Sequence, residues 1–81
     1  MISNEEIELR LKESQDVEYV QVKGDGYHYE LIIVSDAFQG KSKVARQQWV
    51  YAKLKDYITS GSLHALSMKT LTKEEWGKCH G

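Results

Sequence analysis

Two histidines occupy similar places in the chain, each directly before a segment rich in β-forming residues. His28 precedes the letters YELIIV, and His64 precedes ALSMKTL. Neutral imidazole is a common ligand of zinc, copper and iron, so the two residues could together form half of a metal site. A histidine at the end of a strand is, however, more often a solvated or structural residue. In Rieske-type centres two histidines hold one iron of a [2Fe-2S] cluster and thiolates hold the other, so a partner that brought cysteines would complete such a site.

Three predicted strands must position these histidines. Residues 17–22 alternate between apolar and polar side chains, and the glycines of the Gly-Asp-Gly run at 24–26 turn the chain. Residues 27–34 form a second strand, whose LIIV run is apolar on both faces and indicates a central position. These two strands should form an antiparallel hairpin. Residues 64–71 read as a third strand.

The predicted helices begin at recognisable capping residues. Ser3 and Glu6 form a capping box that starts a helix ending near Ser14, and Thr72 and Glu75 form a second box that starts a short C-terminal helix. The main helix is predicted over residues 42–59, and Gly61 supplies its C-terminal stop. Its buried positions recur at helical intervals: Val44, Val50, Tyr51, Leu54 and Ile58. A short turn at residues 36–38 should precede it, with Phe38 packed in the core, and residues 77–81 should fray.

The order of these elements predicts how the histidines lie. A strand, helix, strand crossover is normally right-handed and makes its two strands parallel. The strand at 64–71 should therefore run parallel to the strand at 27–34 in one sheet. Parallel strands begin at the same edge of a sheet, so His28 and His64 should share one exposed rim if the two strands are neighbours.

Length and composition restrict the class of protein. A chain of 81 residues is expected to form one domain over 1–81, and its composition is that of a folded protein. The single cysteine, Cys79, makes no internal disulfide, which favours a reducing compartment, and we expect a cytoplasmic protein without a membrane segment. The Cys79-His80 pair lies in the predicted frayed tail and is interpreted as incidental. No catalytic motif is present, so we expect no enzyme activity.

A basic segment lies between residues 37 and 55, where the chain carries no acidic residue although its net charge is −1. Such a segment at a helix entrance could contact phosphate or a glutathione carboxylate, and Trp49, predicted to be partly exposed, could extend the contact surface. The simpler interpretation is a solvated helix face. Tyr51 is assigned to the core. The candidate contact residues are Lys41, Lys43, Arg46, Lys53, Lys55 and Trp49.

Several motifs together resemble one known family. They are VSDAFQGKS at 34–42, VYAKL at 50–54, HALSMKT at 64–70 and TKEEW at 72–76, and they extend over nearly the whole chain. This combination resembles the BolA-like family. The RQQ stretch at 46–48 and the absence of a long C-terminal tail make the chain most similar to its short bacterial IbaG-type branch.

The resemblance implies an α+β fold of order αββααβα, similar to a class II KH domain, with a three-stranded mixed sheet packed against helices. It also implies a partner, a monothiol glutaredoxin of the CGFS type, and a bridging [2Fe-2S] cluster shared with that glutaredoxin and glutathione. His64 matches the family's near-universal histidine, and His28 matches a second ligand of the hairpin region.

Two alternatives remain open at this point. Some BolA-like proteins are described as transcription regulators, which implies that the basic helix could bind DNA. The glycine pattern GxxG of KH domains is missing here, because the corresponding loop reads QGKSK. The third alternative is an apo homodimer or stress-response adaptor that holds no cluster.

Overall fold

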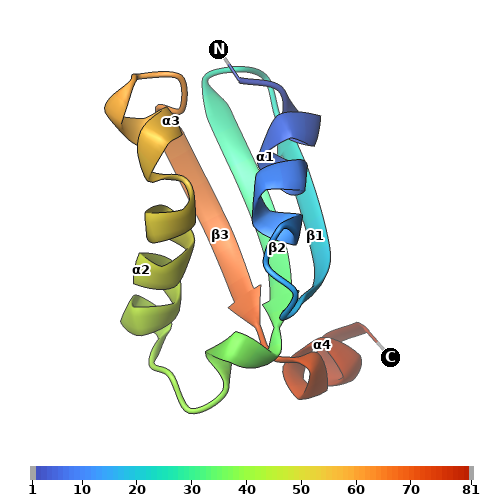
Figure 1. Ribbon diagram of the computed structural model, residues 1–81. Helices are drawn as coiled ribbons and strands as arrows, with labels where there is room; N and C mark the ends of the chain where they lie inside the picture. Colours follow the sequence, from blue (N-terminus) through green and yellow to red (C-terminus); the bar gives the residue numbers. More distant parts are fainter. Residues whose placement is uncertain (1, 81) are drawn as a thin grey trace.

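The computed structural model describes residues 2–80, apart from the side chain of His80, and shows one sheet with helices along it (Figure 1). The strands lie in the order β1-β2-β3. β1 pairs antiparallel with β2, and β2 pairs parallel with β3, so the predicted mixed sheet is confirmed. The elements are α1 (Asn4–Lys12), β1 (Val17–Gly24), β2 (His28–Ser35), the 3-10 turn η1 (Asp36–Phe38), α2 (Lys43–Lys53), α3 (Lys55–Thr59), β3 (Ala65–Leu71) and α4 (Lys73–His80).

The core lies between the sheet and the helices. α1 lies across β1 and β2, and α2 and α3 run beside β3 (Figure 1). Alternate residues of the central strand β2 point at the helices, namely Tyr29, Leu31 and Ile33, and they are almost completely buried. Phe38 is also fully buried, as predicted, and anchors the connection from β2 to α2.

Both predicted N-terminal caps are present. The Ser3 hydroxyl accepts the amide of Glu6 at 3.1 Å and starts α1. At α4 the box is reciprocal, because Thr72 Oγ1 accepts the amide of Glu75 at 3.1 Å and Glu75 Oε1 accepts the amide of Thr72 at 2.9 Å. Local sequence alone therefore locates the start of both helices.

The prediction of one continuous helix over residues 42–59 is wrong, because the helix is interrupted at Leu54. Here the backbone leaves the helical region (φ −105°, ψ 12°), so α2 ends at Lys53 and a separate α3 begins at Lys55. The Leu54 amide donates to both Val50 O and Tyr51 O, which tightens the last turn. Leu54 is fully buried, and Tyr57 beyond it packs against the core. Packing breaks the helix where neither glycine nor proline is present.

Three of the positions assigned to the buried stripe are exposed. Val44, Tyr51 and Ile58 leave 62%, 42% and 40% of their surface accessible, so the assignment of Tyr51 to the core is wrong. Val44 and Tyr51 are seven residues apart and share one exposed face of α2, whereas Ile58 belongs to α3, beyond the break at Leu54. Trp49 is half-buried, as predicted.

The C-terminal helix is longer than predicted. α4 continues through Gly77 to His80 instead of fraying there, while residue 81 lies outside the described residues. The Trp76 ring stacks on Tyr19 of β1 with centroids 5.0 Å apart, which holds the helix against the sheet. Cys79 is exposed, as predicted, and the Cys79-His80 pair is only partly within the described residues.

Gly24 at the end of β1 is required by close packing. A Cβ at this position would lie 2.6 Å from Tyr29 Cδ1 and 2.7 Å from the backbone oxygen of His28. The buried Tyr29 ring cannot move aside, so Gly24→Ala should lower the free energy of unfolding by about 1–3 kcal/mol. Gly77→Ala is the control, because nothing lies within 4 Å of its Cβ and it should stabilise α4 slightly. Urea denaturation measures the free energy of unfolding of both variants. Equal changes in the two would contradict the close packing at Gly24.

Candidate functional site

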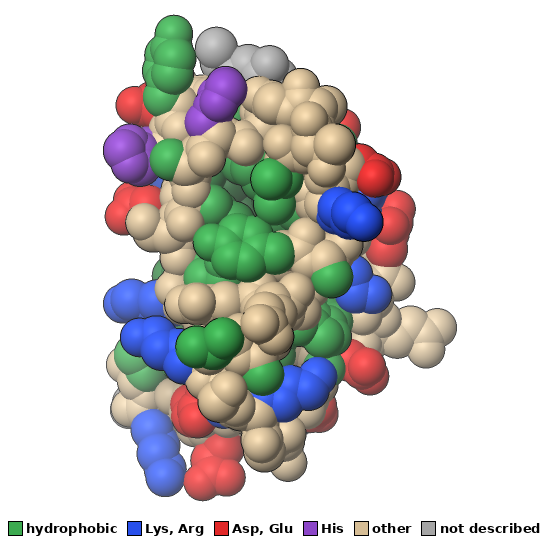
Figure 2. Space-filling model, turned by 90° about the vertical axis from the view of Figure 1, so that its left-hand side faces the viewer, with side chains coloured by type: hydrophobic (Ala, Val, Ile, Leu, Met, Phe, Trp, Pro, Cys, Tyr) green, Lys and Arg blue, Asp and Glu red, His purple; other side chains and the backbone are tan. Residues whose placement is uncertain are grey.

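His28 and His64 lie at one rim of the sheet. His28 is the first residue of β2, and its partner across the parallel ladder is Ala65, so His64 precedes that partner by one residue. Both side chains are exposed, and histidine side chains lie close together at one end of the molecule in Figure 2. The shared rim predicted from the crossover is therefore confirmed.

The hairpin loop fixes the backbone at His28. The Asp25 carboxylate accepts the amides of Tyr27 and His28, both at 2.9 Å, and the Asp25 amide donates to the His28 carbonyl at 3.2 Å. These amides, that of His28 foremost, hold the pKa of the Asp25 carboxyl below its ordinary value. Gly26 completes the loop at φ 98°. The start of β2 is thus ordered by local bonds.

His64 is positioned by the turn that follows α3. Gly61 reverses the chain at φ 82°, and the Leu63 amide then donates to the Tyr57 carbonyl at 3.1 Å. Leu63 is buried with 4% of its surface exposed. His64 therefore stands between a buried anchor and the first residue of β3, which fixes its backbone.

The two imidazoles border different hollows. His64 lines a groove of about 470 Å³ between β3 and the helices α2 and α3, whose other walls include Tyr51, Ile58 and Leu66. His28 instead lines a polar hollow with Lys23, Gly24, Asp25, Glu30 and Ser67. The rim thus has an apolar side at His64 and a polar side at His28.

The arrangement has the donor set of half a metal site. Within residues 2–80 neither imidazole ring takes part in a hydrogen bond or an ion pair, which leaves ring nitrogens available as ligands. The same residues contain no group of three or more His, Cys, Asp or Glu that could hold a metal ion. The two histidines could therefore bind a metal ion or cluster whose remaining ligands come from another molecule. The two-histidine iron of a Rieske centre illustrates such a ligand set.

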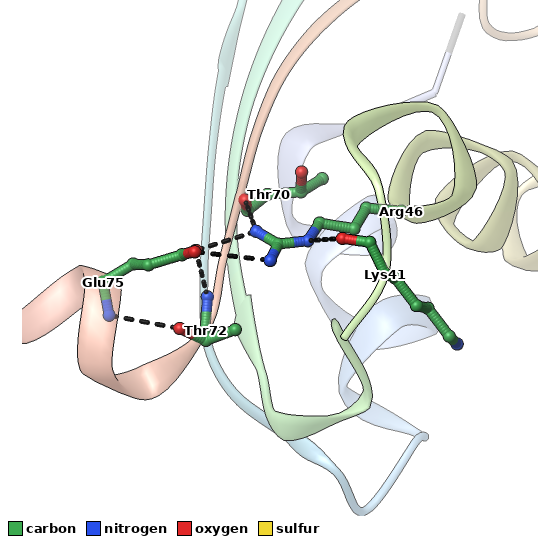
Figure 3. A network of polar contacts seen from close by, with 5 residues as sticks. All are labelled: Lys41, Arg46, Thr70, Thr72 and Glu75. Carbon is green, nitrogen blue, oxygen red and sulfur yellow. Dashed lines mark hydrogen bonds and ion pairs between the residues drawn. The ribbon is translucent and has the colours of Figure 1, made fainter. Parts of the chain in front are cut away.

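The basic segment does not form one surface, because Arg46 makes contacts inside the protein (Figure 3). Its Nε donates to Lys41 O at 3.1 Å, and its Nη1 donates to Thr70 O at 3.0 Å and to Glu75 Oε1 at 2.7 Å. Nη2 reaches Glu75 Oε2 at 3.3 Å, so the pair is bidentate. Arg46 thereby joins the loop before α2, the end of β3 and the start of α4.

The remaining basic residues lie at three different places. Lys53 lies over the Trp49 ring, with Nζ 5.2 Å from its centroid, and Trp49 packs edge-on against Phe38. Lys41 and Lys43 line a hollow near the end of β3, whereas Lys55 lines the groove beside His64.

The Arg46-Glu75 pair should make stability depend on pH. Hydrogen bonding to Arg46, with a smaller contribution from the Thr72 amide, lowers the pKa of Glu75 from 4.5 to about 2. A carboxyl with a depressed pKa stabilises the fold above its unfolded value, and this stabilisation is lost as the pH falls from about 4.5 towards 2. Glu75→Gln should therefore lower the urea midpoint at pH 7 and reduce its dependence on pH in that window.

Glu74→Gln is the matched control for this prediction. Glu74 belongs to the same helix turn and forms an exposed i,i+4 ion pair with Lys78, which contributes little to stability. Equal urea midpoints and equal acid dependence for the two variants would show that Glu75 has no special role.

The apolar groove is the feature that sequence reasoning missed. Its exposed apolar walls, Tyr51 and Ile58, come from two helices separated by the break at Leu54, so the helical period of residues 42–59 could not reveal it. Lys69 of β3, which lines the same hollow as Lys41 and Lys43, was also missed.

The fold and the rim define a class of protein. It is a small α+β domain with a three-stranded mixed sheet and a pair of exposed histidines at the end of the sheet where β2 and β3 begin. A family model described as BolA-like protein matches residues 3–75, and the chain belongs to the BolA-like family. The acid stress protein IbaG of Escherichia coli K12 is 39% identical over 77 residues, covering 95% of this chain and 92% of that protein. The predicted resemblance to the short bacterial branch is therefore confirmed.

Solved structures of BolA domains share the fold. The BolA domain of SufE1 from Arabidopsis thaliana superposes with a TM-score of 0.81 at 35% identity, covering 93% of this chain and 99% of that one. Yeast Fra2 gives a TM-score of 0.74 at 32% identity, with 95% and 86% covered. Among the described residues, no helix has the length and apolar character needed to cross a membrane.

Proposed function

We propose that this protein is an iron-sulfur adaptor that binds a monothiol glutaredoxin of the CGFS type and contributes histidine to a shared [2Fe-2S] cluster. The observation that carries the proposal is the rim on which two exposed imidazoles stand with no hydrogen-bond partner among the described residues. Family membership supports a regulatory or adaptor role of this kind.

The residues that the structure describes supply too few ligands to hold a cluster by themselves. The chain's only cysteine, Cys79, belongs to α4, whereas the histidine rim is formed by the starts of β2 and β3. The glutaredoxin cysteine and glutathione are therefore the proposed ligands of the other iron, and His64 and His28 the ligands from this side. The cluster when bound supplies the redox and transfer chemistry, and the protein supplies position. We expect no catalytic reaction.

His64 is the stronger of the two proposed ligands. It adjoins an apolar groove that a partner could cover, so the bond between imidazole and iron would form away from water. His28 adjoins a polar hollow with Asp25 and Glu30, which stays more hydrated.

The experiment is a titration of the cluster-bearing CGFS glutaredoxin dimer with this protein, followed by visible absorption and circular dichroism. We expect a saturable change of the cluster spectrum at an equimolar ratio of the two proteins. An unchanged spectrum at every ratio would refute the proposal.

The salt and pH dependence of binding distinguishes this function from DNA binding through Lys41, Lys43 and Lys55. Phosphate contacts weaken steeply as salt rises, whereas cluster ligation should depend mainly on pH, because a protonated imidazole cannot bind iron.

A further inference from the structure

The two outer strands of the sheet differ in how their free edges are covered. On β1, Glu8 of α1 accepts the Val22 amide at 2.9 Å and so blocks that edge. On β3, Arg46 reaches the Thr70 carbonyl at 3.0 Å. Alternate residues of a strand direct their backbone groups to the same side, so the amides and carbonyls of Leu66 and Met68 also point outward. Within the described residues, no loop or side chain bonds to them.

Two hollows follow one another along this edge. The groove beside His64 reaches Leu66, and a second hollow of about 310 Å³ reaches Met68 and Thr70. Leu66 and Met68 face the helices but are only half-buried, whereas the corresponding residues of β2 are buried. The space beside β3 is therefore open along most of the strand.

The two hollows differ in chemistry. The first has exposed apolar walls, Tyr51 and Ile58. The second is surrounded by Lys41, Lys43 and Lys69, and its one acidic residue, Glu75, is already paired with Arg46. Figure 2, which views the molecule from the side of α2 and α3, shows hydrophobic side chains in the middle of this face and lysine and arginine side chains on both sides of them.

We propose that the outer edge of β3 binds an extended peptide segment of a partner protein as a fourth strand. Free backbone groups on an edge strand pair with a peptide backbone, and flanking hollows select its side chains. The chemistry of the two hollows requires apolar residues beside Tyr51 and acidic residues beside Lys43 and Lys69. A peptide fits better than a nucleic acid, because the first hollow is apolar and the free groups are strand amides and carbonyls.

The test uses a random peptide library displayed against the immobilised full chain, followed by binding measurements with the enriched peptides. We expect enriched sequences to combine an apolar half with an acidic half. Hydrogen exchange of the complex should show new protection at the amides of Leu66 and Met68.

Surface variants test the two hollows separately. The double variant Lys43→Glu, Lys69→Glu should weaken peptide binding roughly tenfold or more at low salt. Tyr51→Ser should weaken it to a similar extent. The control is Leu9→Ser with Lys12→Glu on α1, which changes exposed residues outside the hollows and should leave binding unchanged.

Three results would overturn the proposal. Enriched peptides without acidic residues would show that the lysines of the second hollow do not select acidic side chains. Protection of Leu66 and Met68 in the peptide-free protein, rising with its concentration, would assign the edge to a second copy of the chain. Binding of a single-stranded DNA oligonucleotide that is sensitive to the same variants, with no peptide enriched, would assign it to nucleic acid. His28→Ala should retain peptide binding, because His28 lines a different hollow, and this variant separates the peptide site from cluster ligation.

Discussion

His64→Ala should abolish the change that the protein causes in the visible circular dichroism of the glutaredoxin cluster, whereas His28→Ala should reduce that change only in part. The reason is the difference in their surroundings. His64 is held between the buried Leu63 and β3 and borders the apolar groove, while His28 follows a hairpin loop and borders a polar hollow. Titration of both variants into the same glutaredoxin sample measures the difference.

Folding must be unchanged in these variants for the comparison to hold. Both imidazoles are exposed and make no hydrogen bond within residues 2–80, so each alanine variant should keep the urea midpoint of the unsubstituted chain. A larger spectral loss in His28→Ala than in His64→Ala would reverse the proposed ranking of the ligands.

Phe38→Ala should cause the largest loss of stability. The side chain is completely buried, packs edge-on against Trp49 with centroids 5.3 Å apart, and lies beneath the Arg46 guanidinium. Removing a buried phenylalanine costs about 3–5 kcal/mol, a large share of the roughly 5–15 kcal/mol that stabilises a small domain. Urea denaturation at neutral pH should show a strongly lowered midpoint.

Two other variants calibrate that prediction. Phe38→Leu retains much of the apolar volume and should cost less than Phe38→Ala. Leu9→Ala removes a side chain that is 68% exposed and should change the free energy of unfolding little. A cost for Phe38→Ala no larger than that for Leu9→Ala would contradict the assignment of Phe38 to the core.

The sheet and the rim could be predicted because they follow from local patterns and one topological rule. Alternation and the glycine turn define the hairpin, and the right-handed crossover makes β3 parallel to β2. Those two steps put His28 and His64 at one rim if the two strands are neighbours, and the structure adds the register that pairs His28 with Ala65. The side-chain cap at Ser3 and the reciprocal capping box at Thr72 are equally local.

The features that escaped prediction depend on what lies opposite a residue. The helical period of residues 42–59 cannot show that Tyr51 faces an open groove or that buried Leu54 ends α2. Arg46 and Glu75 are 29 residues apart, so their pairing is invisible in the sequence and Arg46 seemed free to contact nucleic acid. Charge and periodicity describe one element at a time, and these sites form between elements.

The most direct test of imidazole ligation is pulsed electron paramagnetic resonance of the reduced cluster. The sample is the complex of ¹⁵N-histidine-labelled protein with unlabelled glutaredoxin. We predict a strong hyperfine coupling from a directly bound ¹⁵N nucleus, which disappears in the labelled His64→Ala variant. A spectrum with no coupling to ¹⁵N, in a sample shown to contain both proteins in one complex, would contradict cluster ligation by this protein.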